Sequence, residues 1–235
     1  MRGRTPPTTR LGRVCTTISA TTATEAASKA ARAFALGSDI VELRADLLAR
    51  PADAASKELS HLSRKSVITV RRKDEGGGFD GPEDERLELI SSLAKTNPLF
   101  IDVELRTAES NGGWLDSLAK RPTRIVSWHD FAGTKDTREL KRLREEAAPY
   151  GDVVKIVTTA RSAEDNWKVL RLYQDEPKGL IAFCMGGAGM VSRLVSLQLG
   201  SPISYAALPD DPVAPGQLPV TMMVGLKRLW EGFSW

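Results

Sequence analysis

The chain has 235 residues, 41% hydrophobic and 27% charged, and this composition is that of a globular protein rather than a disordered one. Its longest apolar run, residues 179–191, contains four glycines and stops at Ser192 and Arg193. Such a run is too short and too interrupted to cross a bilayer, so we expect no membrane partner.

The formal net charge of +3 comes from one end of the chain. The first thirteen residues carry four arginines and no acid, and removing these four charges from +3 leaves −1. A near-neutral body gives little support for nucleic-acid binding, which needs a basic face on the fold. We therefore expect residues 1–10 to form a flexible basic tail, residues 11–235 to form one domain, and no nucleic-acid partner. Binding of nucleic acid through the tail alone is kept as a separate hypothesis.

The two cysteines, Cys15 and Cys184, lie far apart in apolar stretches. They suggest neither a disulfide framework nor a zinc site, so we expect a cytoplasmic protein without a metal. Residues 1–35 are rich in Arg, Thr, Ser and Ala, with Glu25 as the sole acid, which is also typical of an organelle transit peptide. A strand at 13–18 followed by an Ala-rich helix is the preferred interpretation, because it begins a pattern that continues along the chain.

Short apolar, β-branched runs alternate with amphipathic segments along the whole chain. The runs predict strands centred near residues 14, 40, 67, 99, 125, 153, 180 and 203. The segments between and after them predict helices over residues 23–36, 52–64, 82–96, 112–120, 135–148, 162–174, 188–199 and 217–231. Eight βα units in this length predict a single-domain α/β protein, a closed (β/α)₈ TIM barrel. The alternative, a doubly wound open sheet, lacks its Gly-x-Gly-x-x-Gly fingerprint after the first strand.

Charged and polar residues stand late in several of the predicted strands. In a barrel, alternate strand residues face the interior, and catalytic residues lie at the carboxyl ends of the strands. Residues of the same parity within one strand would therefore form a polar cup at the barrel mouth. The competing interpretation is a set of internal salt bridges, or strands with one solvated face. The residues concerned are Glu42, Arg44 and Asp46, then Thr69 and Arg71, then Asp102 and Glu104, then Ser127 and His129.

Lys155 and His129 are the strongest candidates for chemistry. Lys155 is flanked on both sides by valine and isoleucine, and desolvation makes an amine a better nucleophile toward a carbonyl. Its alternative is an ammonium paired with a carboxylate such as Glu42 or Glu104. His129 ends a strand, which suits a general acid/base near neutral pH, although a purely structural histidine is the alternative. His61 is expected on a helix surface and inert.

Two loops resemble parts of a binding site. Residues 185–193 follow strand seven and open a helix, and a Gly-rich turn of this kind can hold an anion with backbone N–H groups and Arg193. Residues 214–217 follow strand eight in a Pro-rich loop, where a lid would bring Gln217 over the barrel mouth.

These segments, in this order, resemble the type I 3-dehydroquinate dehydratases of the shikimate pathway. Each motif is weak alone, but the order of the seven is specific, and they cover nearly the whole chain. The matching segments are 42–46, 70–71 with 75–77, 127–131, 152–156, 185–193, 200–201 and 214–217.

The resemblance implies a (β/α)₈ barrel that dehydrates 3-dehydroquinate to 3-dehydroshikimate through a lysine imine, without cofactor or metal, and suggests a homodimer. It implies that Lys155 forms the imine, that His129 is the general acid/base and that Glu75 orients this histidine. It further implies that Arg193 grips the substrate carboxylate and that Met185 is an apolar contact. The residues that would hold ring hydroxyls and the carboxylate are Glu42, Arg44, Arg71 and Gln217.

One position departs from the family pattern. Many members carry a serine before Ala-Pro-Gly-Gln, where this chain has Val213, so one substrate hydrogen bond of about 1 kcal/mol is in doubt. Two other functions remain open. A class I aldolase acting on sugar phosphates would also use a barrel lysine, and would use the Gly-rich turn for phosphate. A non-catalytic barrel with idle motifs would bind substrate without turnover.

Overall fold

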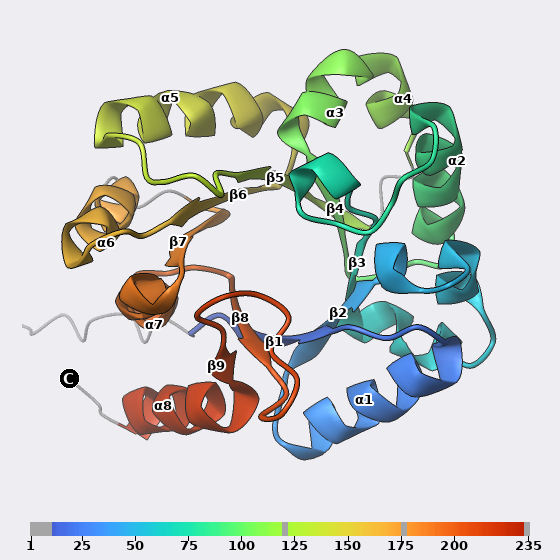
Figure 1. The fold of residues 1–235 in the computed structure, drawn as a ribbon, viewed down its shortest axis with the longest axis horizontal. Coiled ribbons are helices and arrows are strands. Elements are labelled where there is room, and N and C mark those ends of the chain that lie inside the picture. The colour runs from blue at the N-terminus through green and yellow to red at the C-terminus, as the bar shows by residue number, and fades with distance from the viewer. Residues whose placement is uncertain (1–10, 119–121, 175–177, 233–235) are drawn as a thin grey trace, which may run out of the picture.

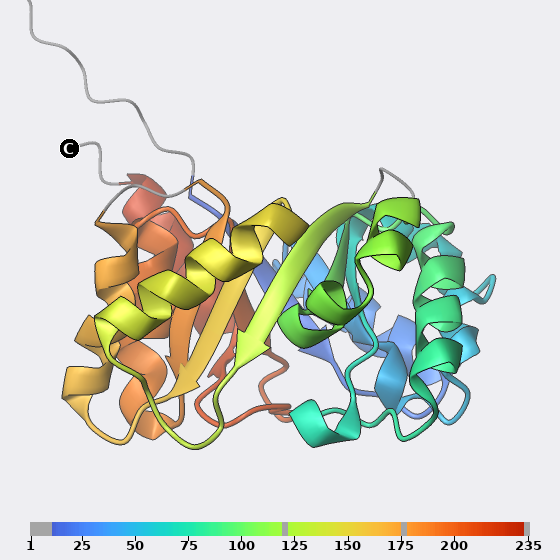
Figure 2. The ribbon, with the colours of Figure 1, turned by 90° about the horizontal axis from the view of Figure 1, so that it is seen from above.

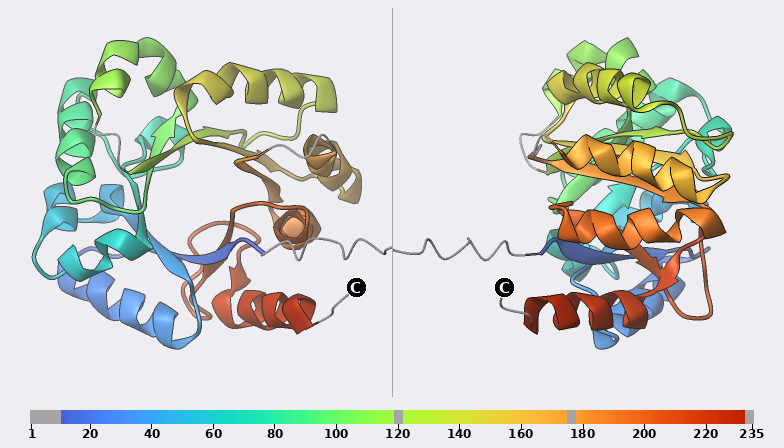
Figure 3. Two further views of the ribbon diagram at one scale, coloured as in Figure 1. Left: turned by 180° about the vertical axis from the view of Figure 1, so that it is seen from behind. Right: turned by 90° about the vertical axis from the view of Figure 1, so that its left-hand side faces the viewer.

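The computed structural model describes residues 11–118, 122–174 and 178–232. The predicted basic tail, residues 1–10, lies outside the described residues. Parallel strands form one curled, barrel-like sheet with helices around its outside, as Figure 1 and the reverse view in Figure 3 show. The strands are β1 (Arg13–Ile18), β2 (Ile40–Arg44), β3 (Ser66–Thr69), β4 (Phe100–Glu104), β5 (Thr123–His129), β6 (Val153–Thr159), β7 (Leu180–Met185), β8 (Ile203–Ala207) and β9 (Leu218–Pro219).

The helices follow the strands in the predicted alternation. The α-helices are α1 (Ala23–Ala35), α2 (Glu83–Ala94), α3 (Leu105–Ser110), α4 (Gly112–Ser117), α5 (Thr137–Ala147), α6 (Ala163–Leu170), α7 (Met190–Gln198) and α8 (Val220–Gly232). The 3-10 helices are η1 (Ala45–Leu47), η2 (Pro51–Ala55), η3 (Ser60–Lys65), η4 (Lys73–Glu75), η5 (Ala148–Tyr150), η6 (Arg171–Tyr173) and η7 (Gly187–Gly189). Local signals begin several of them: the Thr22 and Asp136 side chains accept from backbone N–H groups of α1 and α5.

One expected helix forms differently. Residues 52–64 make the two 3-10 helices η2 and η3 rather than one amphipathic α-helix. The hydroxyls of Ser60, Ser63 and Ser66 each donate to the carbonyl three residues earlier, at 2.7, 2.8 and 3.0 Å. Local bonds of this kind compete with the α-helical pattern, so the segment adopts the tighter turn.

The sheet order is β7-β6-β5-β4-β3-β2-β1-β8-β9, all parallel. Among the described residues no backbone ladder joins β7 to β8, although the two lie side by side in the ring in Figures 1 and 3. Side chains close this seam, because the rings of Phe183 and Tyr205 lie 6.2 Å apart within one buried cluster. The predicted TIM barrel is therefore confirmed, with a seam closed by packing.

The barrel interior has two parts. Its apolar base takes one buried residue from each of the first eight strands: Cys15, Ile40, Val67, Phe100, Ile125, Val153, Ile181 and Ile203. Two residues further along each strand comes the polar upper part: Thr17, Glu42, Thr69, Asp102, Ser127, Lys155, Phe183 and Tyr205. The carboxyl ends of the strands share one edge, at the bottom of Figure 2, and the loops of the predicted site gather there.

Candidate active site

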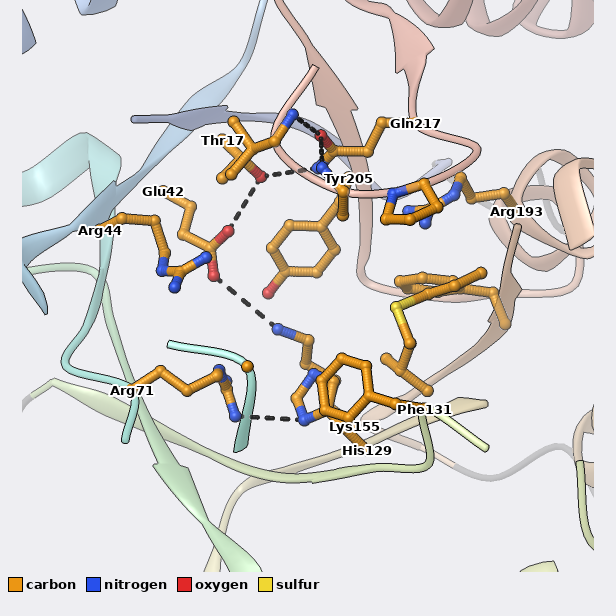
Figure 4. A pocket seen from close by; sticks show the side chains of 17 residues that line it. Thr17, Glu42, Arg44, Arg71, His129, Phe131, Lys155, Arg193, Tyr205 and Gln217 are labelled. Atoms are coloured by element: carbon orange, nitrogen blue, oxygen red, sulfur yellow. Dashed lines mark hydrogen bonds and ion pairs between the residues drawn. The ribbon is translucent and has the colours of Figure 1, made fainter. Parts of the chain in front are cut away.

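A cavity of about 200 Å³ opens at this carboxyl-terminal edge. Its wall combines side chains from or next to seven of the eight barrel strands with residues of helix α7 and the loop between β8 and β9. Figure 4 shows how the labelled side chains surround it. The predicted site residues in this wall are Glu42, Arg44, Arg71, His129, Lys155, Met185, Arg193 and Gln217. Sequence positions up to 175 residues apart thus meet in one place, as the mouth of a barrel requires.

Lys155 lies near the centre of the cavity and is 5% exposed. Its Nζ lies 3.1 Å from Asp102 Oδ2, 3.8 Å from Glu42 Oε1 and 4.3 Å from the centre of the Tyr205 ring. The amine is thus buried between two carboxylates and the face of an aromatic ring. The sequence suggested either a desolvated amine or an amine beside a carboxylate, and Lys155 is both buried and beside carboxylates. These carboxylates are Glu42 and Asp102, rather than Glu104.

Glu42 is held in place by two threonines from the neighbouring strands. The hydroxyls of Thr17 and Thr69 donate to separate Glu42 oxygens, each at 2.9 Å. Thr17 Oγ1 also accepts from Gln217 Nε2 at 3.1 Å, and Gln217 Oε1 accepts from the Val213 N–H at 2.9 Å. This chain of bonds fastens the loop after β8 to the strands beneath it.

The same loop is also fastened to the turn after β7. Gly216 has φ +73°, and a Cβ there would lie 2.3 Å from the Gly186 carbonyl oxygen, so only glycine allows this approach. The Gly186 N–H donates to the Pro215 carbonyl at 3.1 Å. Residues 213–217 of the expected lid are thus fastened both to β1 and to the turn after β7.

Arg71, which lines the cavity, forms a buried ion pair with Asp102. Arg71 Nη2 donates to Asp102 Oδ1 at 2.6 Å, and the Ser127 hydroxyl donates to the same oxygen at 2.7 Å. Burial opposes the charge of Asp102, but Arg71 and Lys155 outweigh it and hold the pKa of Asp102 well below its usual range. Asp102 is therefore a carboxylate at neutral pH.

His129 is bonded to Arg71 as well. Its Nδ1 lies 3.1 Å from Arg71 Nη1, and because a guanidinium only donates, Nδ1 accepts and Nε2 carries the ring proton. Desolvation in the cavity wall, followed by the charges of Arg71 and Lys155, lowers the pKa of His129 well below 6.5. His129 is thus a neutral imidazole at neutral pH, rather than a group that titrates there.

Glu75 is a predicted site residue that does not line the cavity. It ends η4, is partly buried, and lies 3.4 Å from the Nε of Arg106. Burial and the nearby Glu104 raise its pKa. Within the described part of the chain, the side-chain hydrogen bond of His129 is made with Arg71 and not with Glu75.

Two arginines of the cavity differ in their partners. Arg44 is paired in bidentate fashion with Asp46, at 3.0 and 2.6 Å. Arg193 is 2% exposed, lies 4.2 Å above the Phe183 ring and has no acidic partner among the described residues. Its Nε is buried without a hydrogen bond, and burial lowers its pKa to about 10. A cation in this state is costly unless an anion binds beside it.

Several side chains of the site have no individual role predicted from the sequence: Asp102, Ser127, Tyr205 and Thr17. Asp102 and Ser127 were placed on the correct strand faces, so strand parity was the signal for them. Tyr205 and Thr17 carry no charge, so they did not stand out in their strands. Tyr205 follows the interior residue Ile203 by two positions, and this spacing could have placed its side chain in the barrel interior. The same spacing relates Thr17 to Cys15. Among the described residues no group of three or more His, Cys, Asp or Glu side chains could hold a metal, and no helix there is long and apolar enough to cross a membrane.

One cavity at the mouth of the parallel barrel is thus lined by a buried lysine, a histidine and an arginine without an acidic partner among the described residues. This arrangement is that of a barrel enzyme that uses a lysine in its active site. The chain belongs to the type I 3-dehydroquinase family, whose sequence profile matches residues 14–231. It is 42% identical to the 3-dehydroquinate dehydratase of Pyrococcus abyssi over 200 residues, covering 83% of this chain and 89% of that protein.

Solved structures agree in fold. The crystal structure of the 3-dehydroquinate dehydratase of Aquifex aeolicus is 30% identical with a TM-score of 0.76, covering 94% of this chain and 100% of that one. That of Geobacillus kaustophilus is 23% identical with a TM-score of 0.81, covering 95% and 93%. The barrel predicted from the sequence is therefore the fold of this family.

Proposed function

We propose that the chain dehydrates 3-dehydroquinate to 3-dehydroshikimate through an imine on Lys155. Family membership defines the reaction, and one observation carries its assignment to these residues: Lys155, His129 and the unpaired Arg193 face the same cavity. The neutral Lys155 amine attacks the substrate ketone, and water leaves to give a protonated imine. His129 takes a proton from the adjacent C2, and later returns it to the departing C1 hydroxyl, which leaves as water. A water molecule then hydrolyses the product imine, which releases 3-dehydroshikimate and restores the Lys155 amine.

The other predicted residues are assigned to binding. Arg193 would receive the substrate carboxylate, because it is buried, charged and without an acidic partner. Met185 would pack against the ring, and Glu75 would orient His129 after the segment around η4 approaches it. The ring hydroxyls and the carboxylate would meet Glu42, Arg44, Arg71 and Gln217.

The competing assignment, a sugar-phosphate aldolase, needs free N–H groups at the Gly-rich turn after β7. Two of these are already bonded within the protein. The Gly189 N–H donates to Gly186, and the Ser192 N–H donates to the Asn166 side chain at 3.1 Å. This leaves fewer donors for a phosphate, which supports the carboxylate substrate.

We also propose that the protein acts as a homodimer in the cytoplasm. The family resemblance suggests the dimer, and both cysteines are free and buried, which fits a reducing compartment. Light scattering during size-exclusion chromatography measures the mass directly, and a monomer at working concentration would contradict the dimer.

The imine is the step to test first. Incubation with 3-dehydroquinate and borohydride, followed by peptide mass spectrometry, should place the added mass on Lys155, and absorbance should rise as the enone product forms. Absence of both signals would exclude the dehydratase and direct the search to sugar phosphates.

A further inference from the structure

One buried carboxylate joins the two groups that the proposed reaction needs. We propose that Asp102 is a positioning residue that holds Lys155 and His129 in one rigid frame and serves as the counter-ion of the protonated imine. This inference rests on the proposed function, and it assigns a role to a residue that the family motifs above leave out.

The geometry gives each oxygen of Asp102 its own task. Oδ2 lies 3.1 Å from Lys155 Nζ, while Oδ1 accepts from Arg71 at 2.6 Å and from Ser127 at 2.7 Å. Arg71 then reaches His129 Nδ1 at 3.1 Å. Asp102 therefore contacts Lys155 directly and His129 through a single intervening side chain.

The strand register explains why this carboxylate can be rigid. Asp102 is 2% exposed in the middle of β4, where it pairs with Thr69 of β3 and Ile125 of β5. Arg71 follows Thr69 by two residues, and Ser127 follows Ile125 by two residues. Side chains two residues apart point to the same face, so Arg71 and Ser127 lie on the interior face close to Asp102. Neighbouring strands on either side thus supply its donors, and Lys155 of β6 approaches from the next strand round.

The charge of Asp102 matters more after the imine has formed. Condensation of the neutral amine with the ketone releases one water, and the imine nitrogen then takes up one proton. This protonated nitrogen keeps a single N–H where the ammonium had three, so it depends on one acceptor. Asp102 Oδ2 is the nearest acceptor to Nζ, and Glu42 Oε1 lies further away at 3.8 Å. A carboxylate at this distance stabilises the cationic imine, the form that draws electrons from C2.

Asp102 also affects His129, through Arg71. Arg71 is held by Asp102, with Glu104 at 3.8 Å as its other carboxylate. If Asp102 lost its charge, Arg71 would lose its shortest ion pair, and the hydrogen bond that fixes the His129 ring would loosen. One substitution should therefore impair both imine formation and proton transfer.

The test compares Asp102→Asn with Glu104→Gln. Glu104 lies on the same strand face, is equally buried and bonds to Arg86 at 2.8 Å. It lies 3.8 Å from Arg71 but makes no hydrogen bond or ion pair with Lys155 or His129. Asp102→Asn should lower kcat by about 100-fold, with KM within about threefold. Cyanoborohydride reduces only the protonated imine, so trapping stops at the pH where the imine loses its proton. This upper pH limit for trapping on Lys155 should be about 1 to 3 pH units lower in Asp102→Asn than in the wild type. Glu104→Gln should keep the wild-type pH limit.

The outcomes separate this inference from the proposed function. No trapping in the wild-type protein would overturn the proposed function itself. Trapping in the wild type, with the same pH limit in Asp102→Asn as in Glu104→Gln, would overturn the role of Asp102 alone. If circular dichroism shows that Asp102→Asn does not fold, Ser127→Ala replaces it, since it removes one donor to Asp102 and keeps every charge. Trapping should then slow about threefold, and an unchanged rate would overturn the proposal.

Discussion

The apolar base and the polar upper part of the barrel interior lie on the same strand faces, two residues apart, yet they differ in almost every side chain. The base is one continuous buried cluster without a charge. The upper part is polar in all positions except Phe183 and contains Glu42, Asp102 and Lys155. A shift of two residues toward the carboxyl ends of the strands therefore separates the core from the site.

The difference shows where stability and function are located. Burial of the base residues stabilises the fold in proportion to the apolar area removed from water. The charges above it are costly to bury, and they are tolerated because most are paired, as Lys155 and Arg71 are with Asp102. Arg193 is the exception among the buried arginines of the cavity, and an anionic substrate would complete its pairing.

The largest effect should follow a change in the polar upper part that leaves the base intact. Lys155→Met keeps the length of the side chain and removes the amine, so turnover should fall by more than about 10⁴-fold. Asp102 keeps its bonds to Arg71 and Ser127, so the fold should persist. Steady-state assays and a thermal melt measure the two quantities, and substantial turnover by this variant would contradict the imine.

The reverse experiment changes the base and leaves the site intact. Ile125→Ala removes a side chain with no exposed surface, directly beneath Ser127 on β5, and should cost about 2 to 5 kcal/mol of unfolding free energy. The kcat of the folded fraction should stay within about threefold of the wild type. Urea unfolding measures the first quantity, and a loss of kcat without a loss of stability would show that the two parts are not separable.

Much of this division was predictable from the sequence. The spacing of apolar runs predicted eight strands, and parity placed Glu42, Asp102 and His129 on interior faces. The 3-10 helix η3, at residues 60–65, was not predictable from periodicity, because serine side-chain bonds there compete with the α-helical pattern.

Partners within the site were harder to predict than positions. Strand parity does not show which of several carboxylates reaches Lys155, because this depends on the stagger of neighbouring strands. Asp102 and Glu104 share one face of β4, yet Asp102 Oδ2 lies 3.1 Å from Lys155 Nζ, whereas Glu104 bonds to Arg86 at 2.8 Å. The seam between β7 and β8 likewise depends on side-chain packing rather than on any pattern within one strand.

The next effect concerns pH and the state of His129. Desolvation and Arg71 lower the pKa of His129 below 6.5, so the neutral base persists as pH falls through that value. The acid limb of kcat/KM should therefore lie below pH 6.5. Once the pH is below the pKa of His129, kcat/KM should fall tenfold for each further pH unit. The unfolded chain binds this proton more readily, so stability should also decline as pH falls below 6.5. A limb centred at or above 6.5 in the rate profile would show that His129 is not the base.

A smaller effect tests how His129 is oriented. Because Arg71 already holds the ring, Glu75→Gln should lower kcat by less than about tenfold. Asp74→Asn is the matched control, since Asp74 is the adjacent carboxylate and also binds Arg106, at 2.8 Å. A loss in Glu75→Gln no larger than that in Asp74→Asn would contradict the proposed role of Glu75 in orienting His129. A loss above 100-fold in Glu75→Gln alone would mean that Glu75, rather than Arg71, is the main group that holds the ring.

The smallest effect concerns the cavity rim, where the family pattern has serine and this chain has Val213. Val213 lines the cavity, and its N–H is already bonded to Gln217 at 2.9 Å, so the backbone offers no replacement for the hydroxyl. Val213→Thr keeps the shape and adds a hydroxyl. One hydrogen bond of about 1 kcal/mol should lower KM about fivefold and leave kcat unchanged.

Val213→Ala is the control for this rim position, because it changes the packing without adding a donor or an acceptor. An equal fall in KM for the alanine and threonine variants would attribute the effect to space rather than to the hydroxyl. A fall confined to threonine would mean that substrate contacts at the rim are adjustable without disturbing Lys155, Asp102 and His129 below. The loop that carries Val213 is bonded through Gln217 to Thr17, and Thr17 to Glu42, so it makes no direct bond to these three groups.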